Sequence, residues 1–429
     1  MKRILCSSLL LALLAACSSV PPESAAPAAP QASGAAANIA LQPLVVPAPD
    51  TFRDTRARPL AGKFRKASWA DLPGWNTDTL DHAWKAFINN CKGLMRPVSG
   101  SLGAPARATP RAWQPVCAAA AQSGISLDAP EAPAVRAFLQ RELQPWRVLD
   151  AAGHPAGGLV TGYYEPLVHA SRTRGGDYQW PLYAPPDDLL TVDLGSEYPA
   201  LVGKRVRGKL VGRRVVPYDT RAQIAADPKK PPVIVWVDDP VDAFFLQVQG
   251  SGRALLPDGQ TILLAYADHN GRPYVSIGRW LADQGQLSLS QASMQNIKAW
   301  ARRNPGRVQE MLDANPAVVF FREQPVVDPD LGPNGAYGIA LIAQRSIAVD
   351  PTFVPLGAPV FLATDYPGSA TPLDRLVFAQ DTGSAIRGAG RADFYWGFGD
   401  AAGQQAGRMK QQGRMWVLWP RQAGVPSAR

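Results

Sequence analysis

The sequence has few of the residues that most often build metal sites and nucleophilic triads. Histidine occurs four times and cysteine four times in 429 residues, and no histidine stands at ligand spacing from a cysteine. The chain also lacks the glycine-rich loops that bind phosphates or dinucleotides. We therefore expect no metal ion and no other cofactor. A Ser/His/Asp triad stays open, but no motif marks one.

Long apolar runs are missing as well. The apolar run at residues 9–16 is too short to span a bilayer. Residues 14–17 (LAAC) resemble the lipobox of bacterial lipoproteins. The pattern predicts a signal peptide over residues 1–16 and a lipid on Cys17. Because Ser18 follows rather than an acidic residue, we expect an outer-membrane lipoprotein facing the periplasm of a Gram-negative bacterium. An ordinary secretory signal that contains a cysteine by chance is the alternative.

Two cysteines remain for the folded protein. Cys6 leaves with the signal peptide and Cys17 carries the lipid, so Cys91 and Cys117 are left. Disulfides persist in exported proteins. We therefore expect Cys91 and Cys117 to form a disulfide that joins two helices of the N-terminal region.

The net charge is moderately positive. The formal charge of +9 falls by two when the signal peptide is removed. Such a charge suits a polymer that carries carboxylates, as the stem peptides of peptidoglycan do. It is equally compatible with nucleic acid or with solubility alone. Charge by itself does not decide the partner.

The 41 prolines, 38 glycines and 12 tryptophans indicate a loop-rich protein that contains β-structure and handles flat apolar or sugar surfaces. A single long helical bundle would not tolerate so many helix breakers. Residues 17–50 are rich in alanine, proline and serine, which predicts a disordered tether.

Beyond the tether, the spacing of apolar residues alternates between helix and strand. Helices are predicted at 77–91, 113–122, 135–143, 288–303, 306–314 and 401–411, with Thr77 or Asp78 capping the first. Strands are predicted at 159–164, 232–237, 243–249 and 262–266 and through most of the last hundred residues. This order indicates an α+β protein, mainly β, in which two β units carry helices on their ends.

Three aspartates follow or flank predicted strands. Asp381 follows an apolar strand and precedes a glycine turn, Asp393 precedes the aromatic residues 394–396, and Asp350 ends an earlier strand. Strands that end in aspartate beside glycine can place acids at a cleft. For Asp350, which precedes a proline, capping of a turn is an equal alternative.

At this spacing the three aspartates resemble the three-Asp (3D) segment of the membrane-bound lytic murein transglycosylase A family. The resemblance extends from about residue 70 to 420, in the family's order. Its further motifs lie at 161–166 (TGYYEP), 248–252 (VQGSG), 274–278 (YVSIG), 293–295 (SMQ), 316–321 (PAVVFF) and 397–403 (GFGDAAG).

The resemblance implies a double-psi β-barrel domain with a second β-domain inserted into it and a sugar-binding groove between the two. The barrel domain would comprise residues 51–158, with its helices, and 325–420. The inserted domain would comprise 159–324 and the tail 421–429. The expected partner is a peptidoglycan glycan strand and not nucleic acid, and membership of a wall-synthesis complex stays open.

The resemblance also implies a lyase, of the exotransglycosylase kind, that cuts between N-acetylmuramic acid and N-acetylglucosamine without water. The sequence does not distinguish cuts at strand ends from cuts within strands. The family's catalytic acid falls on Asp393 and its supporting carboxylate on Asp381. The expected sugar contacts are Thr161, Tyr163, Tyr164, Gln249, Ser251, Gln295 and Asp350, with glycines at 162 and 250–252 permitting close approach of the backbone. A structural role, such as packing of a strand tyrosine in the core or at its rim, is an equal alternative for the individual contacts.

One carboxyl group suffices for this chemistry, because the sugar's own C6 hydroxyl replaces water as the nucleophile. Asp393 would protonate the leaving oxygen and then accept the C6 proton. We expect ionised Asp381, together with the neighbouring aromatic residues, to raise the pKa of Asp393.

Three other functions are alternatives. A muramidase would hydrolyse the same bond. A non-catalytic wall-binding lipoprotein would keep the groove without activity. Residues 381–384 (DTGS) also match an aspartic peptidase, but a pepsin-like chain needs a second such motif, and the sequence has none.

Overall fold

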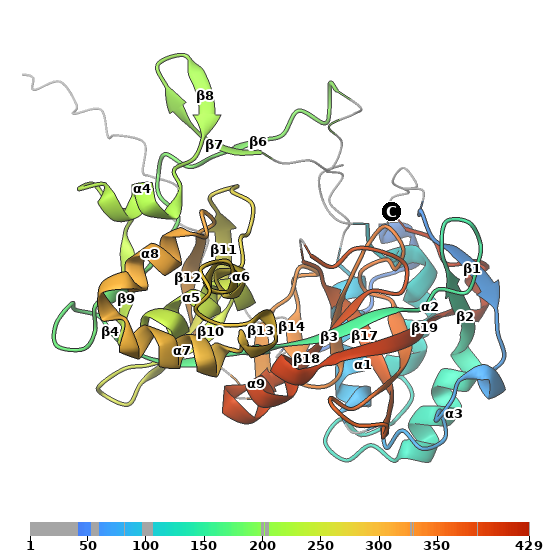
Figure 1. Cartoon of the computed structure of the whole chain (residues 1–429). Coiled ribbons are helices and arrows are strands. Elements are labelled where there is room, and N and C mark those ends of the chain that lie inside the picture. Colours follow the sequence, from blue (N-terminus) through green and yellow to red (C-terminus); the bar gives the residue numbers. More distant parts are fainter. Residues whose placement is uncertain are drawn as a thin grey trace, which may run out of the picture. The chain divides into compact units, whose positions relative to one another are not determined.

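The computed structural model describes residues 42–52, 60–80, 82–96, 106–198, 201, 206–326, 328, 330–383 and 385–428. The expected signal peptide, the expected lipid site at Cys17 and most of the expected tether lie outside the described residues, as does Ser384. No helix in the described ranges is long and apolar enough to cross a membrane. The described chain is a mixed α+β protein rich in strands, as the sequence predicts (Figure 1).

Six strands of the largest sheet close into a barrel. They run in the order β19-β16-β17-β15-β18-β3, and β3 returns to pair with the first half of β19. The pairs β15–β17 and β18–β3 are parallel, and the closed sheet is consistent with the expected double-psi barrel. The strands are β3 (Gly158–Glu165), β15 (Ser346–Val349), β16 (Pro359–Asp365), β17 (Pro372–Asp381), β18 (Ala392–Phe398) and β19 (Lys410–Pro420), and β2 (Leu143–Leu149) and β1 (Lys63–Lys66) extend the sheet beyond β19.

Strand β3 belongs to this barrel sheet. The boundary expected at residue 159 would give almost the whole strand to the inserted domain, but β3 pairs with both β18 and β19. The barrel sheet therefore includes residues up to Glu165, and the chain enters the second sheet only at β4 (Leu167–Ser171). This placement matters because β3 carries several of the expected site residues.

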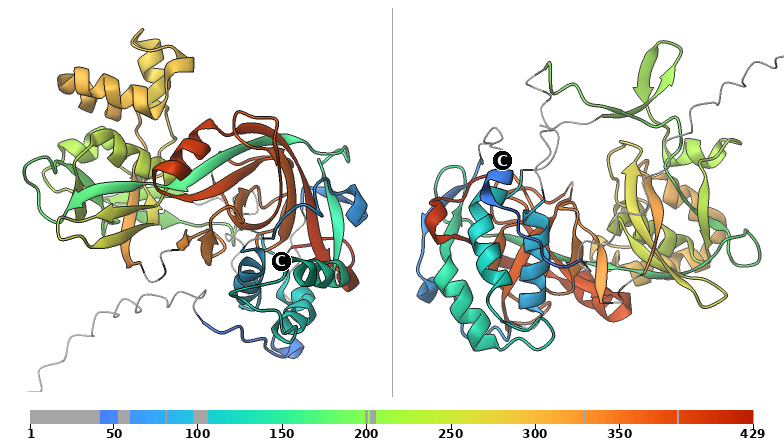
Figure 2. Two further views of the ribbon diagram at one scale, coloured as in Figure 1. Left: turned by 90° about the horizontal axis from the view of Figure 1, so that it is seen from below. Right: turned by 180° about the vertical axis from the view of Figure 1, so that it is seen from behind.

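Three N-terminal helices pack against the barrel and share its main hydrophobic core (Figure 2). They are α1 (Ala83–Leu94), α2 (Pro110–Ala121) and α3 (Ala132–Glu142). The expected disulfide is present: Cys91 of α1 and Cys117 of α2 are bonded, with their Cα atoms 5.7 Å apart. The last helix, α9 (Gly399–Arg408), connects β18 to β19.

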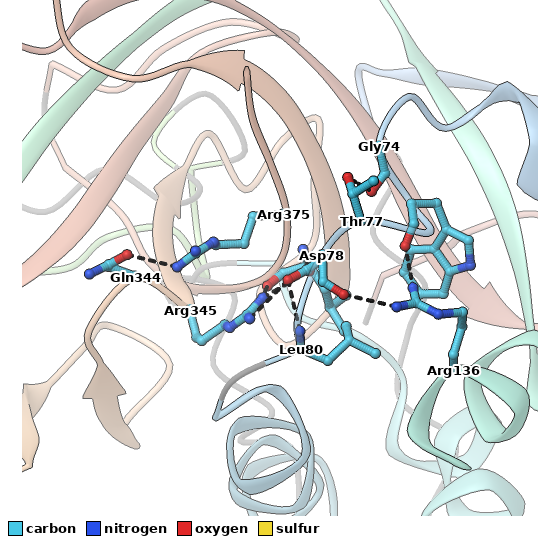
Figure 3. Close-up of polar contacts among 10 residues, drawn as sticks. Gly74, Thr77, Asp78, Leu80, Arg136, Gln344, Arg345 and Arg375 are labelled. Carbon is cyan, nitrogen blue, oxygen red and sulfur yellow. Dashed lines mark hydrogen bonds and ion pairs between the residues drawn. The ribbon is translucent and has the colours of Figure 1, made fainter. Parts of the chain in front are cut away.

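The predicted start of the first helix is wrong. Helix α1 begins at Ala83, and neither Thr77 nor Asp78 caps it. Asp78 is instead buried and forms an ion pair with Arg345, at 2.9 Å, just before β15 (Figure 3). Its carboxylate also accepts a hydrogen bond of 2.8 Å from the backbone N–H of Leu376 in β17. Asp78 therefore ties the N-terminal segment to the barrel.

The second sheet is six-stranded, in the order β12-β11-β10-β4-β9-β5. Its other strands are β5 (Trp180–Tyr183), β9 (Val233–Val237), β10 (Gly252–Leu255), β11 (Thr261–His269) and β12 (Val319–Pro325). The helices of this region are α4 (Arg221–Ala226), α5 (Pro240–Gln249), α6 (Ile277–Asp283), α7 (Met294–Arg303) and α8 (Val308–Asp313).

The strand predicted at 243–249 is wrong, because these residues form α5. Asp239 caps the helix by accepting hydrogen bonds from the N–H groups of Val241 and Asp242, at 2.8 and 3.0 Å. Pro240 occupies the first turn and Gly250, with φ 81°, ends the helix. These are ordinary start and stop signals. The apolar residues between them pack into two cores, Ala243 and Leu246 into one and Val241 and Phe244 into the other, which suits a helix buried on more than one side.

Smaller elements complete the described chain. A three-stranded sheet contains β6 (Leu190–Val192), β7 (Val206–Val211) and β8 (Arg214–Pro217), and a two-stranded sheet contains β13 (Leu331–Asn334) and β14 (Ala340–Ile342). Short 3-10 helices occupy Pro49–Thr51, Trp69–Asp71, Leu289–Gln291, Pro305–Arg307 and Arg421–Ala423. The helix predicted at 288–303 is thus split into a 3-10 turn and α7.

Candidate active site

The two candidate acids lie in one row across the barrel sheet. Asp381 of β17 and Asp393 of β18 both pair with Ala348, which lies on β15 between them. On its other side Asp393 pairs with Thr161 of β3. Residues paired across a sheet project from the same face, so the topology brings together residues that are more than two hundred positions apart in sequence.

Asp393 is held by its neighbour in this row. The hydroxyl of Thr161 donates a hydrogen bond of 2.6 Å to Oδ1 of Asp393. The residue is only partly exposed, and burial raises the pKa of its carboxyl to about 6. The hydrogen bond from Thr161 and the charge of Arg391 oppose this rise, and the charge of Asp381 adds to it. A carboxyl group with this pKa keeps a sizeable protonated fraction at mildly acidic pH.

The causes of the raised Asp393 pKa differ in their order of importance from those predicted from the sequence. Burial of Asp393 is the largest cause, and the charge of Asp381 is the smallest of those that act. Asp381 therefore assists the pKa of Asp393 but does not dominate it.

Asp381 accepts hydrogen bonds from three donors. Its Oδ1 accepts from the backbone N–H groups of Ala336 and Thr382, both at 2.9 Å. Its Oδ2 accepts from the hydroxyl of Tyr163 at 3.2 Å. Burial nevertheless raises the pKa of Asp381, against the opposing effect of these three bonds. The carboxylate is held in a single orientation by groups from β3, β17 and the segment after β13.

Tyr163 contacts both Asp381 and the strand that carries Asp393. Its ring lies 5.2 Å, centroid to centroid, from the ring of Tyr395, which follows Asp393 by two residues on β18. Burial, followed by the charges of the two aspartates, raises the pKa of Tyr163 well above its usual value. The phenol therefore stays protonated and can only donate to Asp381.

Asp350 supports the loop between the two acids. It is buried, and its carboxylate accepts hydrogen bonds from the N–H and hydroxyl of Thr352, at 3.0 and 2.7 Å. It also accepts a hydrogen bond of 2.9 Å from the N–H of Gly388, which lies in the loop from Asp381 to Asp393. These bonds match the turn-capping alternative, and a sugar contact of Asp350 stays a prediction.

Two glycines are required by close packing beside the acids. A Cβ atom on Gly158 would lie 2.3 Å from the backbone of Gly390, so the loop before Asp393 passes directly over the start of β3. A Cβ atom on Gly162 would lie 2.7 Å from the Cα atom of Ala406 in α9. The close approach expected at residue 162 therefore occurs, but its partner is helix α9.

The remaining expected sugar contacts lie where the end of β3 meets α5 and α7. Gln249, at the end of α5, accepts a hydrogen bond of 3.3 Å from the backbone N–H of Tyr164. The hydroxyl of Tyr164 lies 3.9 Å from Sδ of Met294, next to exposed Gln295 in α7. Ser251 is half-buried between α5 and β10. Tyr164, Gln249 and the start of α7 thus adjoin one another, beyond the end of the row of acids.

An ion pair that the sequence did not predict lies at the end of β3. Glu165 is fully buried, and Nε of Arg253 on β10 donates a hydrogen bond of 3.0 Å to its Oε2. The guanidinium carbon of Arg253 lies 3.9 Å from the centroid of the Phe398 ring, at the end of β18. Both residues adjoin predicted motifs, but no local pattern in the sequence pairs them.

A buried polar chain behind Asp381 was also missed. The hydroxyl of Ser346 donates a hydrogen bond of 2.6 Å to the side chain of Gln380, whose amide donates to Asn90 of α1 at 3.2 Å. Asn90 in turn donates to the carbonyl of Gly357 at 2.8 Å. Buried amides need such partners, so this chain fixes the residue before Asp381 against the helical layer.

Comparisons with known proteins match this arrangement. The family model described as the MltA specific insert domain matches residues 159–322, and the 3D domain model matches residues 345–419. Membrane-bound lytic murein transglycosylase A of Escherichia coli K12 is 30% identical over 291 residues, which are 66% of this chain and 71% of that protein.

Solved structures are similar over most of the chain. MltA from Neisseria gonorrhoeae is 35% identical with a TM-score of 0.73, and the match covers 87% of this chain and 98% of that one. The lytic transglycosylase LtgG of Burkholderia pseudomallei is 43% identical with a TM-score of 0.57, covering 86% and 100%. E. coli MltA with bound chitohexaose is 26% identical with a TM-score of 0.57, covering 85% and 96%.

Proposed function

The chain belongs to the membrane-bound lytic murein transglycosylase A family, and we propose that it cleaves peptidoglycan glycan strands. The bond is the β-1,4 linkage between N-acetylmuramic acid and N-acetylglucosamine, and the product end is 1,6-anhydro-N-acetylmuramic acid. The observation that carries this proposal is the partly exposed Asp393, with a pKa raised to about 6 and a hydrogen bond from Thr161.

Asp393 acts first as the acid. Its raised pKa leaves a protonated carboxyl group available near neutral pH, and that group donates its proton to the glycosidic oxygen as the bond to C1 breaks. The hydrogen bond from Thr161 to Oδ1 leaves Oδ2 as the oxygen that carries the proton. Positive charge then develops at C1 and the ring oxygen, as in other glycosidic cleavages.

Asp393 then acts as the base. The C6 hydroxyl of the muramic acid attacks C1, and the Asp393 carboxylate accepts the C6 proton, which restores the starting state. An intramolecular attack of this kind gains from proximity and needs no activated water. One acid and base group is therefore enough, and atoms balance without a further reactant.

Asp381 is a positioning and charge-stabilising group in this scheme. Three donors already occupy its two oxygens, which suits a fixed negative charge facing the developing positive charge. It suits less well a nucleophile or a base for water, which a hydrolytic glycosidase requires as its second carboxylate. This arrangement favours the transglycosylase over the muramidase.

A glycan ligand is supported by the relatives and by the side chains beyond the acids. The E. coli protein has been solved with chitohexaose bound. Tyr164, near the end of β3, and Gln249, at the end of α5, adjoin each other beyond the row of acids. An aromatic ring can stack on a sugar, and an amide can pair with an acetamido group. We propose that the sugar strand runs past Asp393 toward these residues.

The test is digestion of purified murein in water enriched in heavy oxygen, followed by mass spectrometry of the products. A transglycosylase releases ends that are one water lighter than reducing ends and carry no heavy oxygen. A muramidase releases reducing ends that carry the label. Absence of any released product, with turbidity unchanged, would leave a wall-binding protein without catalysis.

The curated E. coli relative is named as membrane-bound, and we propose the same for this chain through a lipid on Cys17. The motif at residues 14–17 supports this anchor. Expression of Cys17→Ser in a Gram-negative host, followed by fractionation, tests it. The variant should leave the outer-membrane fraction, and an unchanged distribution would contradict the anchor.

A further inference from the structure

The sheet of β6, β7 and β8 has one apolar face, and basic residues lie on the opposite face. Leu210 pairs with Val215 across β7 and β8, and Val206 pairs with Val192 across β7 and β6. Paired residues share a face, and alternate residues of a strand face opposite ways. The apolar face therefore carries Val192, Val206, Leu210 and Val215, and the opposite face carries Arg207, Lys209 and Arg214 together with Val211 and Val216.

No hydrophobic core in the part of the chain that the structure describes covers the apolar face. The exposed fractions of Val206, Leu210 and Val215 are 59%, 61% and 50%. Val211, which ends β7 and pairs with Arg214 on the opposite face, is 54% exposed. None of these side chains belongs to a hydrophobic core among the described residues. Contiguous apolar surface of this kind marks an interaction site more often than single exposed residues do.

The basic residues fall into two groups along the hairpin. At its base, Arg207 pairs with Asp268 at 2.6 Å and Lys209 pairs with Asp219 at 2.5 Å. These pairs fasten the sheet to neighbouring segments of the insert. At its tip, Arg213 and Arg214 are exposed, and neither forms an ion pair with any residue that the structure describes. No acidic residue occurs between Val206 and Pro217.

We propose that the tip of the β7–β8 hairpin (Leu210–Val215; Figure 1) docks onto an anionic lipid surface. Leu210, Val211 and Val215 enter the boundary between headgroups and acyl chains, and Arg213 and Arg214 contact lipid phosphates. Apolar side chains beside unpaired arginines complement a lipid surface, which has apolar acyl chains beneath negatively charged headgroups. This docking surface is separate from the row of acids and independent of the proposed reaction.

Other occupants fit the hairpin less well. A second copy of the chain would bring the same positive charges together, and like charges oppose association. A polar glycan would leave Leu210 and Val215 in contact with hydroxyl groups rather than apolar surface. The combination of apolar and cationic side chains at one tip therefore favours lipid.

The test is flotation with lipid vesicles of the chain that lacks residues 1–16 and carries Cys17→Ser, so that neither the signal peptide nor a lipid binds the vesicles. The protein is oxidised so that the Cys91–Cys117 disulfide is formed. One set of vesicles is phosphatidylcholine alone, and the other is equal parts phosphatidylcholine and phosphatidylglycerol. Arg213→Glu with Arg214→Glu should weaken binding to the anionic vesicles by at least about tenfold, since each basic residue near such a surface contributes roughly fivefold. Leu210→Ser with Val215→Ser should weaken it as well.

The matched control is Arg302→Glu with Arg303→Glu, which changes two exposed arginines at the end of α7 in the same insert. It should bind as the unaltered chain does, and high salt should weaken binding of both. Equal binding by all variants would overturn the proposal. The proposal would also be overturned if the hairpin variants bound vesicles normally but lost self-association or murein cleavage. The hairpin would then bind a partner other than lipid.

Discussion

Nε of Arg253 lies 3.0 Å from the carboxylate of Glu165, which is completely buried. This ion pair joins β10 of the second sheet to the end of β3, the strand that carries Thr161 and Tyr163. Because Arg253 also stacks on Phe398, the same guanidinium contacts the end of the strand that carries Asp393. The pair therefore connects the ends of β3 and β18 to the second sheet.

Glu165→Gln should change how stability depends on pH. Burial raises the pKa of Glu165 to about 7, although the charge and hydrogen bond of Arg253 oppose the rise. A carboxyl group whose folded pKa is raised contributes stability at low pH that is lost as pH rises through the folded value. The free energy of unfolding of the unaltered chain should therefore fall by about 3 kcal/mol more than that of the variant between pH 4 and pH 8.

Urea unfolding across this pH range measures the difference. Glu323→Gln is the matched control, because Glu323 lies on the insert sheet and its pKa is lowered by the hydrogen bond from Arg172. Between pH 4 and pH 8, the free energy of unfolding of the unaltered chain should rise relative to that of Glu323→Gln, whereas it should fall relative to that of Glu165→Gln. Parallel curves for Glu165→Gln and the unaltered chain would show that Glu165 does not titrate in this range.

Asp393→Asn should abolish cleavage, and Asp381→Asn should not abolish it. Loss of a general acid costs about 10²- to 10⁴-fold in rate. Because the acid form of Asp393 is required and its pKa is about 6, kcat/KM should fall about tenfold for each pH unit above that value. Rates of muropeptide release across pH, with circular dichroism as the folding control, test this.

Asp381→Asn should only slightly shift the pH at which kcat/KM begins to fall. Removal of the negative charge of Asp381 lowers the pKa of Asp393, so the fall in kcat/KM should begin at lower pH. The movement should be less than about one pH unit, because burial and not Asp381 is the main cause of the raised value. A larger movement would make Asp381 the principal cause.

Thr161→Val should shift the fall in kcat/KM to higher pH, opposite to the effect of Asp381→Asn. The hydrogen bond from Thr161 lowers the pKa of Asp393, so its loss should shift the fall in kcat/KM to higher pH. Loss of orientation should also reduce kcat by about 10- to 100-fold. Thr161→Ser keeps the hydroxyl and should restore both the pH profile and most of the rate. If serine fails to restore them, the contribution of Thr161 is packing by its methyl group.

Removal of the disulfide should destabilise the barrel domain. Cys91 and Cys117 link α1 to α2 across 26 residues, and a loop of this length stabilises a protein by about 3 kcal/mol when it is closed. Urea unfolding of Cys91→Ala with Cys117→Ala should show this loss. A reductant should destabilise the unaltered chain similarly and leave the double variant unchanged. A reductant effect on the double variant would point to another cause.

The amino-acid sequence by itself determined the local features of this protein. Aromatic and apolar spacing predicted most helices and strands, and the two cysteines left in the mature chain predicted their disulfide. Strand endings beside glycine singled out Asp381 and Asp393. The strand predicted at 243–249 is wrong because Asp239, Pro240 and Gly250 mark the ends of a helix, and the apolar residues between them suit a buried helix as well as a strand.

Only the tertiary structure decided which of these features meet. The row from Asp381 through Ala348 and Asp393 to Thr161 depends on strand order and register, and sheet pairing between distant segments leaves no local pattern. The same holds for Glu165 with Arg253 and for Asp78 with Arg345. The pKa of Asp393 likewise follows from how deeply the folded sheet buries it, and burial is a property of the packed chain rather than of residues 381–396 alone.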